Sequence, residues 1–277
     1  MRYLSTKHLL EQTVAEGLGG GGMSLTLDLA GRTVVVTGGV RGVGAGISRA
    51  FLEAGADVIA VARHEPDALP EGGGRTASFA QLDVRDGDAV EAFAAGLDRV
   101  DVLVNNAGGG PFLPLTEGPL RTHLKILELN LTGPLIMARA LRPLMPDGGS
   151  VINIGSVSGV RPSPGTAAYG AAKAGLHSLT RSLAVEWAPH VRVNTLILGM
   201  IRTELAHLHY GDEAGVEAVA RTVPMDRLGR PDEVGAACVY LASDLASYVT
   251  GSEMLMHGGG ERPAFLDAAT ANKEESR

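Results

Sequence analysis

Short apolar runs alternate along the chain with longer segments in which apolar and small residues recur at helical spacing. The short runs are rich in Val, Ile and Leu, which is typical of strands that are buried on both faces of a sheet. They lie at residues 33–37, 57–61, 77–82, 100–104, 151–155, 191–198 and 252–256. Because helix-length segments separate most of them, the order predicts parallel strands joined by helical crossovers. The pattern predicts an α/β fold, a doubly wound parallel sheet of about seven strands with helices on both faces.

The predicted elements fill residues 23–262, which is a size typical of one domain. Residues 1–22 precede them and end in a run of four glycines, so we expect a flexible N-terminal extension. Residues 263–277 follow the last predicted strand and end in the polar sequence NKEESR, so we expect a frayed C-terminal tail.

A glycine-rich turn joins the first predicted strand to the first predicted helix. Thr37 ends the strand, and Gly38, Gly42 and Gly44 follow at the spacing G-x-x-x-G-x-G. Small residues let the backbone approach a pyrophosphate, and the amino end of the helix supplies N–H donors and a positive dipole. Strand, glycines and helix in this order predict a dinucleotide-binding site, which the glycines alone would not.

Tyr169 and Lys173 lie four residues apart in a predicted helix, so their side chains share one face. A nearby ammonium lowers the pKa of a phenol, which is usually about 10, and can make it an acid and a base near neutral pH. Only four of the 24 basic residues are Lys, although Arg would serve a generic surface helix equally well. Ser156 ends a buried strand thirteen residues before Tyr169 and fits the site better than its rival, Ser158.

With the glycine turn, Ser156, Tyr169 and Lys173 resemble the active site of the short-chain dehydrogenase/reductase family over about residues 28–260. The resemblance implies a Rossmann-type fold and hydride transfer between a nicotinamide cofactor and a ketone or secondary alcohol. For reduction, it implies that Ser156 hydrogen-bonds the substrate carbonyl and that Tyr169 supplies the proton. Lys173 would lower the pKa of Tyr169 and orient the cofactor ribose.

Asn130 completes the catalytic set that the resemblance implies. Pro134 has no N–H, so a helix over about 116–145 leaves the carbonyl of Asn130 without its usual partner and is kinked there. In the family this carbonyl holds a water that connects the active-site Lys to solvent. A kink that serves packing alone is the alternative.

Two arginines favour NADP(H) over NAD(H) as the cofactor. An NAD site usually has an acidic residue near the end of the second strand, where this chain has Ala62 followed by Arg63. Arg41 stands just before the middle glycine, and two Arg side chains could bracket a 2'-phosphate. NAD(H) remains the alternative, in which both arginines are ordinary solvated surface residues.

The resemblance assigns the cofactor contacts position by position. They are Thr37, Gly38, Arg41, Gly42, Val43, Gly44, Arg63, Asp83, Val84, Asn106, Ala107, Gly108, Tyr169, Lys173, Gly199, Ile201 and Thr203. Asp83 has an alternative role as a helix cap. Leu198 stands where the family usually has Pro, which removes a rigid residue from the loop after the strand. Residues 204–224 occupy the family's variable lid, in which His207, His209 and Tyr210 could contact substrate or be solvated.

Composition excludes several partners. The net charge of −7 and the absence of a basic cluster argue against nucleic acid. No apolar run approaches 18 residues, so we expect a cytoplasmic protein without a membrane span. The single cysteine, Cys238, excludes an internal disulfide and is expected to be a small buried hydrophobe, and no metal site is predicted.

The resemblance also implies a homotetramer. Its usual dimer contact pairs the helices expected at about 116–145 and 168–188, where Leu176, Leu179, Leu183 and Trp187 form an apolar stripe. Burial within one subunit would explain the same stripe.

The substrate class stays open at this level. A 3-oxoacyl thioester and a cyclic or aromatic secondary alcohol or its ketone are both compatible with the site, because fold does not determine substrate. A function of another class is a catalytically idle NADP-binding sensor or interaction protein. The complete set of Asn130, Ser156, Tyr169 and Lys173 argues against it.

Overall fold

The computed structural model describes residues 27–268, and a seven-stranded parallel sheet forms its centre. The strands run in the spatial order β5-β2-β1-β6-β7-β8-β9, and every neighbouring pair is parallel. They are β1 (Thr33–Thr37), β2 (Asp57–Ala62), β5 (Ser78–Gln81), β6 (Val102–Asn105), β7 (Gly149–Ser156), β8 (Val191–Leu198) and β9 (Glu253–Met256). This confirms the predicted doubly wound sheet, with strand ends that differ from the expected ones by at most two residues.

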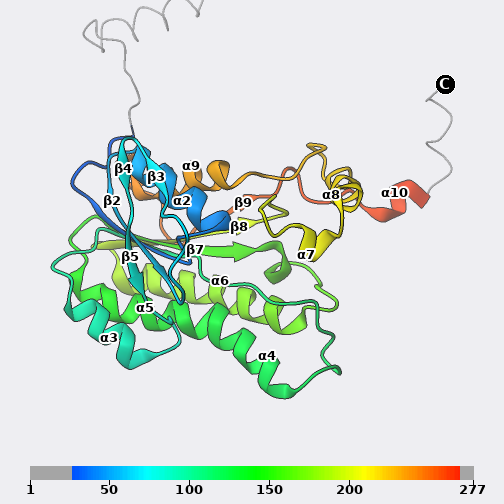
Figure 1. The fold of residues 1–277 in the computed structure, drawn as a ribbon, viewed down its shortest axis with the longest axis horizontal. Coiled ribbons are helices and arrows are strands. Elements are labelled where there is room, and N and C mark those ends of the chain that lie inside the picture. Colours follow the sequence, from blue (N-terminus) through cyan, green and yellow to red (C-terminus); the bar gives the residue numbers. More distant parts are fainter. Residues whose placement is uncertain (1–26, 269–277) are drawn as a thin grey trace, which may run out of the picture.

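Helices cover both faces of the sheet (Figure 1). One face carries α2 (Gly42–Glu53) and α9 (Pro231–Ala242). The other carries α3 (Gly87–Ala95), α4 (Leu120–Leu127), α5 (Gly133–Leu141) and α6 (Ala167–Trp187). Glycines let α2 and α9 approach closely, since a Cβ at Gly235 would lie 2.6 Å from the Cβ of Ala50.

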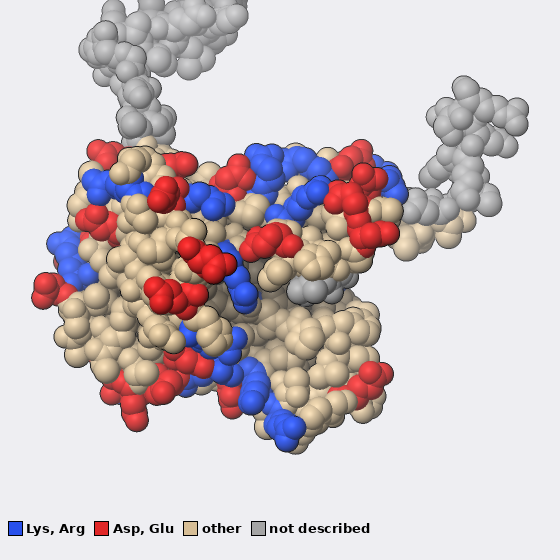
Figure 2. Space-filling view, viewed as in Figure 1, with Lys and Arg blue, Asp and Glu red and all other residues tan. Residues whose placement is uncertain are grey.

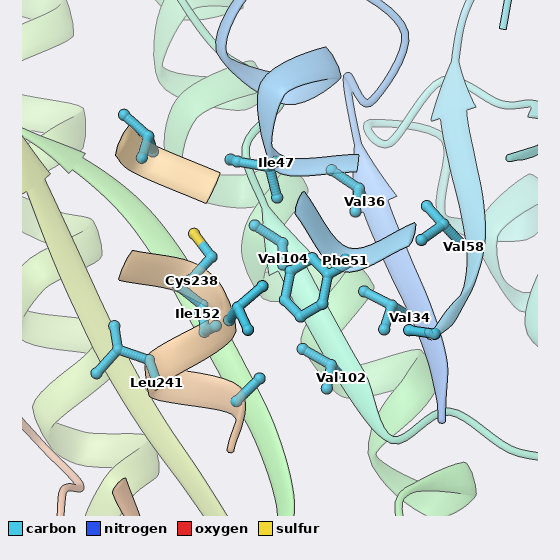
Figure 3. Packing of buried hydrophobic residues seen from close by; sticks show 14 of the residues in the cluster. Val34, Val36, Ile47, Phe51, Val58, Val102, Val104, Ile152, Cys238 and Leu241 are labelled. Carbon is cyan, nitrogen blue, oxygen red and sulfur yellow. The ribbon is translucent and has the colours of Figure 1, made fainter. Parts of the chain in front are cut away.

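The core on the α2 face is built from Phe51 and Ile47, which α2 presents to the apolar side chains of β1, β6 and β7 (Figure 3). Cys238 of α9 belongs to the same cluster and is fully buried, as the sequence predicts. Burial raises the pKa of its thiol, so it stays a neutral apolar group. A second cluster on the opposite face packs α3, α5 and α6 against the sheet.

The helix expected at 116–145 is interrupted. It begins as α4 at Leu120 because Gly118 has a φ of +68° and Pro119 is the N-cap. A π-helical turn, Glu128–Thr132, then separates α4 from α5, and a 3-10 turn, Arg142–Leu144, follows α5. The π turn holds Asn130 and directly precedes the segment with Pro134, which confirms the predicted kink.

Several short elements were not expected from the sequence. A two-stranded ribbon pairs β3 (Glu71–Gly72) with β4 (Arg75–Thr76), and two 3-10 turns are Val157–Gly159 and Asp244–Ala246. The lid segment contains α7 (His207–Tyr210) and α8 (Glu213–Ala220). The expected tail begins with a short helix, α10 (Ala264–Ala268), instead of an irregular segment. The predicted extension at 1–22 lies outside the described residues.

The apolar stripe on α6 is largely buried within one subunit. Leu176 is fully buried, and Leu183 and Trp187 pack against the core on their face of the sheet. The Arg142 guanidinium lies 5.6 Å from the centre of the Trp187 ring, a distance at which a cation and an aromatic ring attract each other. Packing within the subunit therefore accounts for these three residues. Among the helices described, none is both long and apolar enough to cross a membrane.

Candidate active site

The glycine turn adopts a conformation that side chains disfavour. Gly38 and Gly42 have φ values of +63° and +54°, which lie in the left-handed region. A Cβ at Gly44 would overlap the carbonyl oxygen of Gly38, so the first turn of α2 packs directly against the end of β1. The amino end of α2 consequently lies at the carboxyl edge of the sheet, where a phosphate site requires it.

Thr37 joins the ends of β1 and β6. Its hydroxyl accepts the N–H groups of Asn106 and Ala107 at 3.0 and 2.9 Å. The side chain of Asn106 donates back to the carbonyl of Thr37 at 2.9 Å. These bonds fix the loop after β6 beside the glycine turn.

A cleft of about 820 Å³ runs along the carboxyl edge of the sheet. It appears as a hollow in the face shown in Figure 2, with basic and acidic side chains at its edge. Of the predicted catalytic and cofactor residues, all but Thr37 and Asn130 line this cleft. Those two are buried behind its wall and hold the lining loop in place.

Ser156 lies at the last position of β7, where the strand reaches the cleft. Its Oγ accepts the N–H of Ser158 at 3.1 Å, and the same hydroxyl hydrogen-bonds Tyr169. The rival, Ser158, accepts a hydrogen bond from Ser163 at 3.1 Å and does not line the cleft. The geometry therefore favours Ser156 over Ser158.

Lys173 is an almost completely buried cation, with 3% of its surface exposed. Its ammonium donates a hydrogen bond to the carbonyl of Ile154 at 2.8 Å. Burial lowers the pKa of Lys173 to about 8. An amine with this pKa exchanges its proton near neutral pH far more readily than a surface lysine does.

Tyr169 shares the cleft with both residues, but its pKa departs from the sequence prediction. Burial raises the pKa of Tyr169, and a hydrogen bond with Ser156 partly opposes this shift. The Lys173 ammonium lies 5.6 Å from the centre of the Tyr169 ring and is directed to Ile154, so it does not bring the phenol toward neutral pH here. The shift of the Tyr169 pKa is therefore upward, opposite to the direction expected from the sequence.

Asn130 connects the π turn to the loop after β6. Its side chain accepts the N–H of Gly109 at 2.9 Å and donates to the Gly109 carbonyl at 2.8 Å. A third bond joins it to the carbonyl of Ile126 at 2.9 Å. A Cβ at Gly108 would lie 2.6 Å from Asn130 Oδ1 and 3.3 Å from Lys173 Nζ, so only glycine fits between these two side chains.

Side chains of both signs of charge line the cleft. Arg41 and Arg63 are among its lining residues, and so are Glu65 and Asp67. Asp83 accepts two hydrogen bonds from the guanidinium of Arg85. The second acts over 2.6 Å, and the pair lowers the Asp83 pKa to about 2.

The alternative role of Asp83 as a helix cap is wrong. The N-cap of α3 is Asp86, whose side chain accepts the N–H of Ala89 at 3.1 Å. Asp83 caps no helix, and it lines the cleft beside Val84.

The loop after β8 is anchored although Leu198 replaces the usual proline. Leu198 is buried and pairs with β7 and β9 at the end of β8. Beyond it, the N–H of Arg202 donates to the carbonyl of Gly229 at 2.8 Å, and the N–H of Gly229 donates to the carbonyl of Met200 at 3.0 Å. Backbone pairing with a neighbouring segment therefore holds this loop where proline would have stiffened it.

Glu204 is a site residue that sequence reasoning missed. Its Oε1 accepts the N–H of Gly42 at 2.9 Å, across the mouth of the glycine turn. Tyr210, at the end of α7, also lines the cleft, whereas His207 is exposed and the side chain of His209 is not described. The position of Glu204 directly after Thr203 is the one signal that could have pointed to it.

The residues fit a dinucleotide. The N–H of Gly42 already binds an anionic oxygen, which stands where a phosphate oxygen would be held. A hydroxyl, a phenol and an ammonium gather at the other end of the cleft, where they can bind a carbonyl oxygen and move a proton. Between residues 27 and 268, no group of His, Cys, Asp or Glu side chains comes together in a way that could hold a metal ion.

Comparison with known proteins identifies the family. A family model described as enoyl-(acyl carrier protein) reductase matches residues 38–261. The 3beta-hydroxysteroid dehydrogenase 1 of Eggerthella lenta is 37% identical over 249 residues, which cover 84% of this chain and 94% of that protein. The rhamnolipids biosynthesis 3-oxoacyl-[acyl-carrier-protein] reductase of Pseudomonas aeruginosa is 36% identical over 248 residues, which cover 83% and 96%.

A longer relative and a solved structure agree with this result. The short-chain type dehydrogenase/reductase y4vI of Sinorhizobium fredii is 37% identical over 238 residues, which cover 83% of this chain but 43% of that protein. The structure of a Pseudomonas aeruginosa RhlG/NADP active-site complex superposes with a TM-score of 0.76 at 32% identity and covers 84% of this chain and 98% of that one. The chain therefore belongs to the short-chain dehydrogenase/reductase family, as an NAD(P)-dependent oxidoreductase that acts on CH–OH groups.

Proposed function

We propose that this protein interconverts a ketone and a secondary alcohol with NADP(H), using Ser156, Tyr169 and Lys173 in the roles that the family resemblance implies. The observation that carries the proposal is that these three side chains line one cleft with the amino end of α2. A dinucleotide whose diphosphate lies at α2 can reach the side chains at the other end of the same cleft.

In this mechanism the bound cofactor supplies or accepts the hydride at its nicotinamide. Ser156 donates its O–H to the substrate carbonyl oxygen, since the N–H of Ser158 already occupies an acceptor site on its Oγ. Tyr169 donates its phenolic proton to the same oxygen during reduction, and the Lys173 ammonium stabilises the phenolate that remains.

Asn130 acts as a positioning residue in this proposal. Its three hydrogen bonds hold Gly109 and the π turn, and Gly108 fits between Asn130 and Lys173. The Asn130 carbonyl faces no N–H at Pro134, so it is available to a water that passes protons toward Lys173.

The preference for NADP(H) rests on Arg41 and Arg63. Both are exposed and line the adenosine end of the cleft, and neither forms an ion pair with another described residue. Two guanidinium groups can bind a 2'-phosphate with charge-assisted hydrogen bonds. The RhlG complex, which contains NADP, supports the same choice.

The rim on the substrate side is apolar. Gly110 begins it, since a Cβ there would lie 3.6 Å from the Cβ of Tyr169. The ring of Phe112 packs against Gly165 of the segment before α6 and is 74% exposed. Exposed apolar surface next to the start of the helix that carries Tyr169 favours a substrate with an apolar body.

The polar groups near this rim are engaged with one another. Ser163 hydrogen-bonds both Ser158 and Thr166, and Arg161 forms an ion pair with Glu261. Because these side chains bond to one another, few hydrogen-bond partners remain for the hydroxyl groups of a polyol substrate. A 3-oxoacyl thioester or a cyclic ketone is therefore the proposed substrate, in line with the names of the Pseudomonas 3-oxoacyl-[acyl-carrier-protein] reductase and the Eggerthella 3beta-hydroxysteroid dehydrogenase.

A homotetramer is part of the proposal. The apolar stripe on α6 is largely buried within the subunit and therefore does not support association. The support for a tetramer comes instead from exposed apolar side chains on α4 and α5. Leu120, Leu124 and Leu135 are 70%, 47% and 43% exposed. Association through these helices would bury them. Sedimentation velocity should give the mass of a tetramer. A monomer at micromolar protein concentration would contradict the proposed homotetramer.

Spectrophotometry tests the proposal as a whole. NADPH and NADH are mixed in parallel with 3-oxoacyl thioesters of increasing chain length, cyclic ketones, steroids and quinones, and polyols are tested with NADP⁺. We expect turnover with NADPH and a rise in kcat/KM of about fourfold per added methylene until the apolar rim is covered. Turnover with NADH alone would contradict the cofactor choice, and faster turnover of polyols would contradict the substrate class. Cofactor binding without any turnover would favour the idle sensor.

A further inference from the structure

The carboxylate of Glu204 occupies the amino end of α2. Its Oε1 lies 2.9 Å from the N–H of Gly42, the first residue of the helix. This N–H has no acceptor within the helix, and the helix dipole favours an anion beside it. Glu204 comes from the loop after β8, 162 positions away in the chain, so the contact is a tertiary one.

The same place is needed by the diphosphate of the cofactor in the proposed function. A carboxylate and a diphosphate are both anions and require the same N–H donors. They cannot occupy the amino end of α2 together without strong repulsion. Glu204 must therefore leave Gly42 when a dinucleotide binds.

The contact also separates two hollows. The cofactor cleft lies on one side, and a second cavity of about 800 Å³ lies on the other. Both are lined by Arg41, Gly42, Thr203 and Glu204. The second cavity is further lined by Arg49, which forms no ion pair with another described residue. The lining of this cavity carries both signs of charge, with Arg202 and Arg230 on one side of the balance and Asp212, Glu213 and Asp232 on the other. A displaced Glu204 carboxylate thus has a space to enter in which Arg49 can receive it.

We propose that Glu204 is a gate residue of the nucleotide site, which closes the amino end of α2 in the free protein and is displaced by the cofactor diphosphate. This inference rests on the proposed function. The gate lowers the affinity for cofactor, because part of the binding free energy is spent on opening it.

The gate is connected to the substrate side of the cleft. The carbonyl of Glu204 lies 3.1 Å from Nδ1 of His207, the first residue of α7. The last residue of α7, Tyr210, lines the same cleft as Tyr169. Glu204 and Tyr210 therefore belong to one segment that borders the cofactor cleft.

Isothermal titration calorimetry with NADPH tests the gate without any substrate. Glu204→Gln removes the charge and should tighten NADPH binding by about fivefold. Glu204→Asp keeps the charge but shortens the side chain by one methylene, so it should also tighten binding. Glu217→Gln is the matched control, because Glu217 is an exposed residue of α8 that forms no ion pair within residues 27–268, and this variant should bind NADPH as the wild type does.

A second ligand locates the effect. Adenosine 2'-monophosphate contains the adenosine and the 2'-phosphate but has no phosphate on the 5'-oxygen, so its affinity should be the same for wild type and both Glu204 variants. Unchanged or weaker NADPH binding by Glu204→Gln would overturn the gate and leave the proposed function standing. An equal increase in affinity for both ligands would show a general charge effect and would also overturn the gate. The same conclusion would follow if Glu204→Gln bound NADPH more tightly and Glu204→Asp did not. A wild type that binds neither NADPH nor NADH would overturn both.

Discussion

The ammonium of Lys173 donates a hydrogen bond to the carbonyl of Ile154 at 2.8 Å, two residues before Ser156 on the same strand. The bond joins α6 to the end of β7, so the proposed base-modulating group and the substrate-binding hydroxyl are fixed to each other. Among the described residues it is also the single hydrogen bond that this almost fully buried ammonium makes. Such a charge is expensive to bury with so little compensation, which indicates that its place serves function rather than stability.

Lys173→Met should therefore stabilise the protein while it abolishes turnover. The pKa of Lys173 is about 8 in the folded chain, compared with 10.5 as the ordinary value. Between these pH values the unfolded chain binds more protons, so the free energy of unfolding of the wild type rises with pH across this window. The variant lacks this penalty and should be more stable by about 2 kcal/mol at pH 7, after allowance for the lost hydrogen bond.

Urea unfolding at pH 7 and at pH 10 measures this difference. The advantage of the variant should be largest at pH 7 and should shrink toward pH 10, where the wild-type lysine is neutral in the folded state. Lys125→Met, on the exposed surface of α4, is the control and should change little. A Lys173→Met protein that is less stable than wild type by the same amount at both pH values would contradict the burial argument.

Asn130→Ala should reduce both stability and turnover. It removes three hydrogen bonds and leaves the backbone groups of Gly109 and the carbonyl of Ile126 without partners. The expected loss in the free energy of unfolding is about 3 kcal/mol. Turnover should fall further than stability explains, because the loop beside Lys173 loses its anchor.

Asn194→Ala is the matched control for that variant. Asn194 is also fully buried and hydrogen-bonds two backbone groups, the carbonyl of Val249 and the N–H of Ser252, at 2.8 and 3.0 Å. It lies away from the cleft, so its loss should lower stability and leave kcat unchanged. Equal effects of both variants on kcat would remove the positioning role of Asn130.

Arg41→Ala and Arg63→Ala should each shift cofactor preference from NADPH toward NADH. Each substitution removes a charged partner of the 2'-phosphate, so the ratio of kcat/KM values should fall by about tenfold, and by more in the double variant. Arg49→Ala is the control, since Arg49 is an exposed arginine two turns further along α2 that does not line the cofactor cleft. An unchanged ratio in the double variant would assign both arginines to ordinary surface positions.

The sheet and the lining of the cleft could be predicted from sequence because they depend on local signals. Apolar runs marked all seven strands, and the glycine spacing marked the start of α2. Pro134 marked the interruption of the helix at Asn130, although the sequence could not show that the interruption would be a π turn. The start of that helix was set too early because the effect of Gly118 and Pro119 was overlooked.

The remaining features depend on contacts between distant segments. The direction of the Tyr169 pKa is set by burial and by Ser156, and no spacing rule shows that Lys173 turns toward Ile154 instead. The contact between Glu204 and Gly42 joins two loops that are far apart in the sequence and become neighbours only when the sheet has folded. The anchoring of the loop after β8 by Gly229 is of the same kind.

Tyr169→Phe tests the central claim most directly. The variant removes a single oxygen, and with it the proton donor, while the ring and its packing remain. In a single-turnover experiment with bound NADPH and a reactive ketone, the rate of NADPH oxidation should fall by about a thousandfold. The dissociation constant of NADPH should stay within about twofold of the wild-type value, because the phenol contributes little to binding the diphosphate end. Retention of most of the wild-type rate would contradict the account.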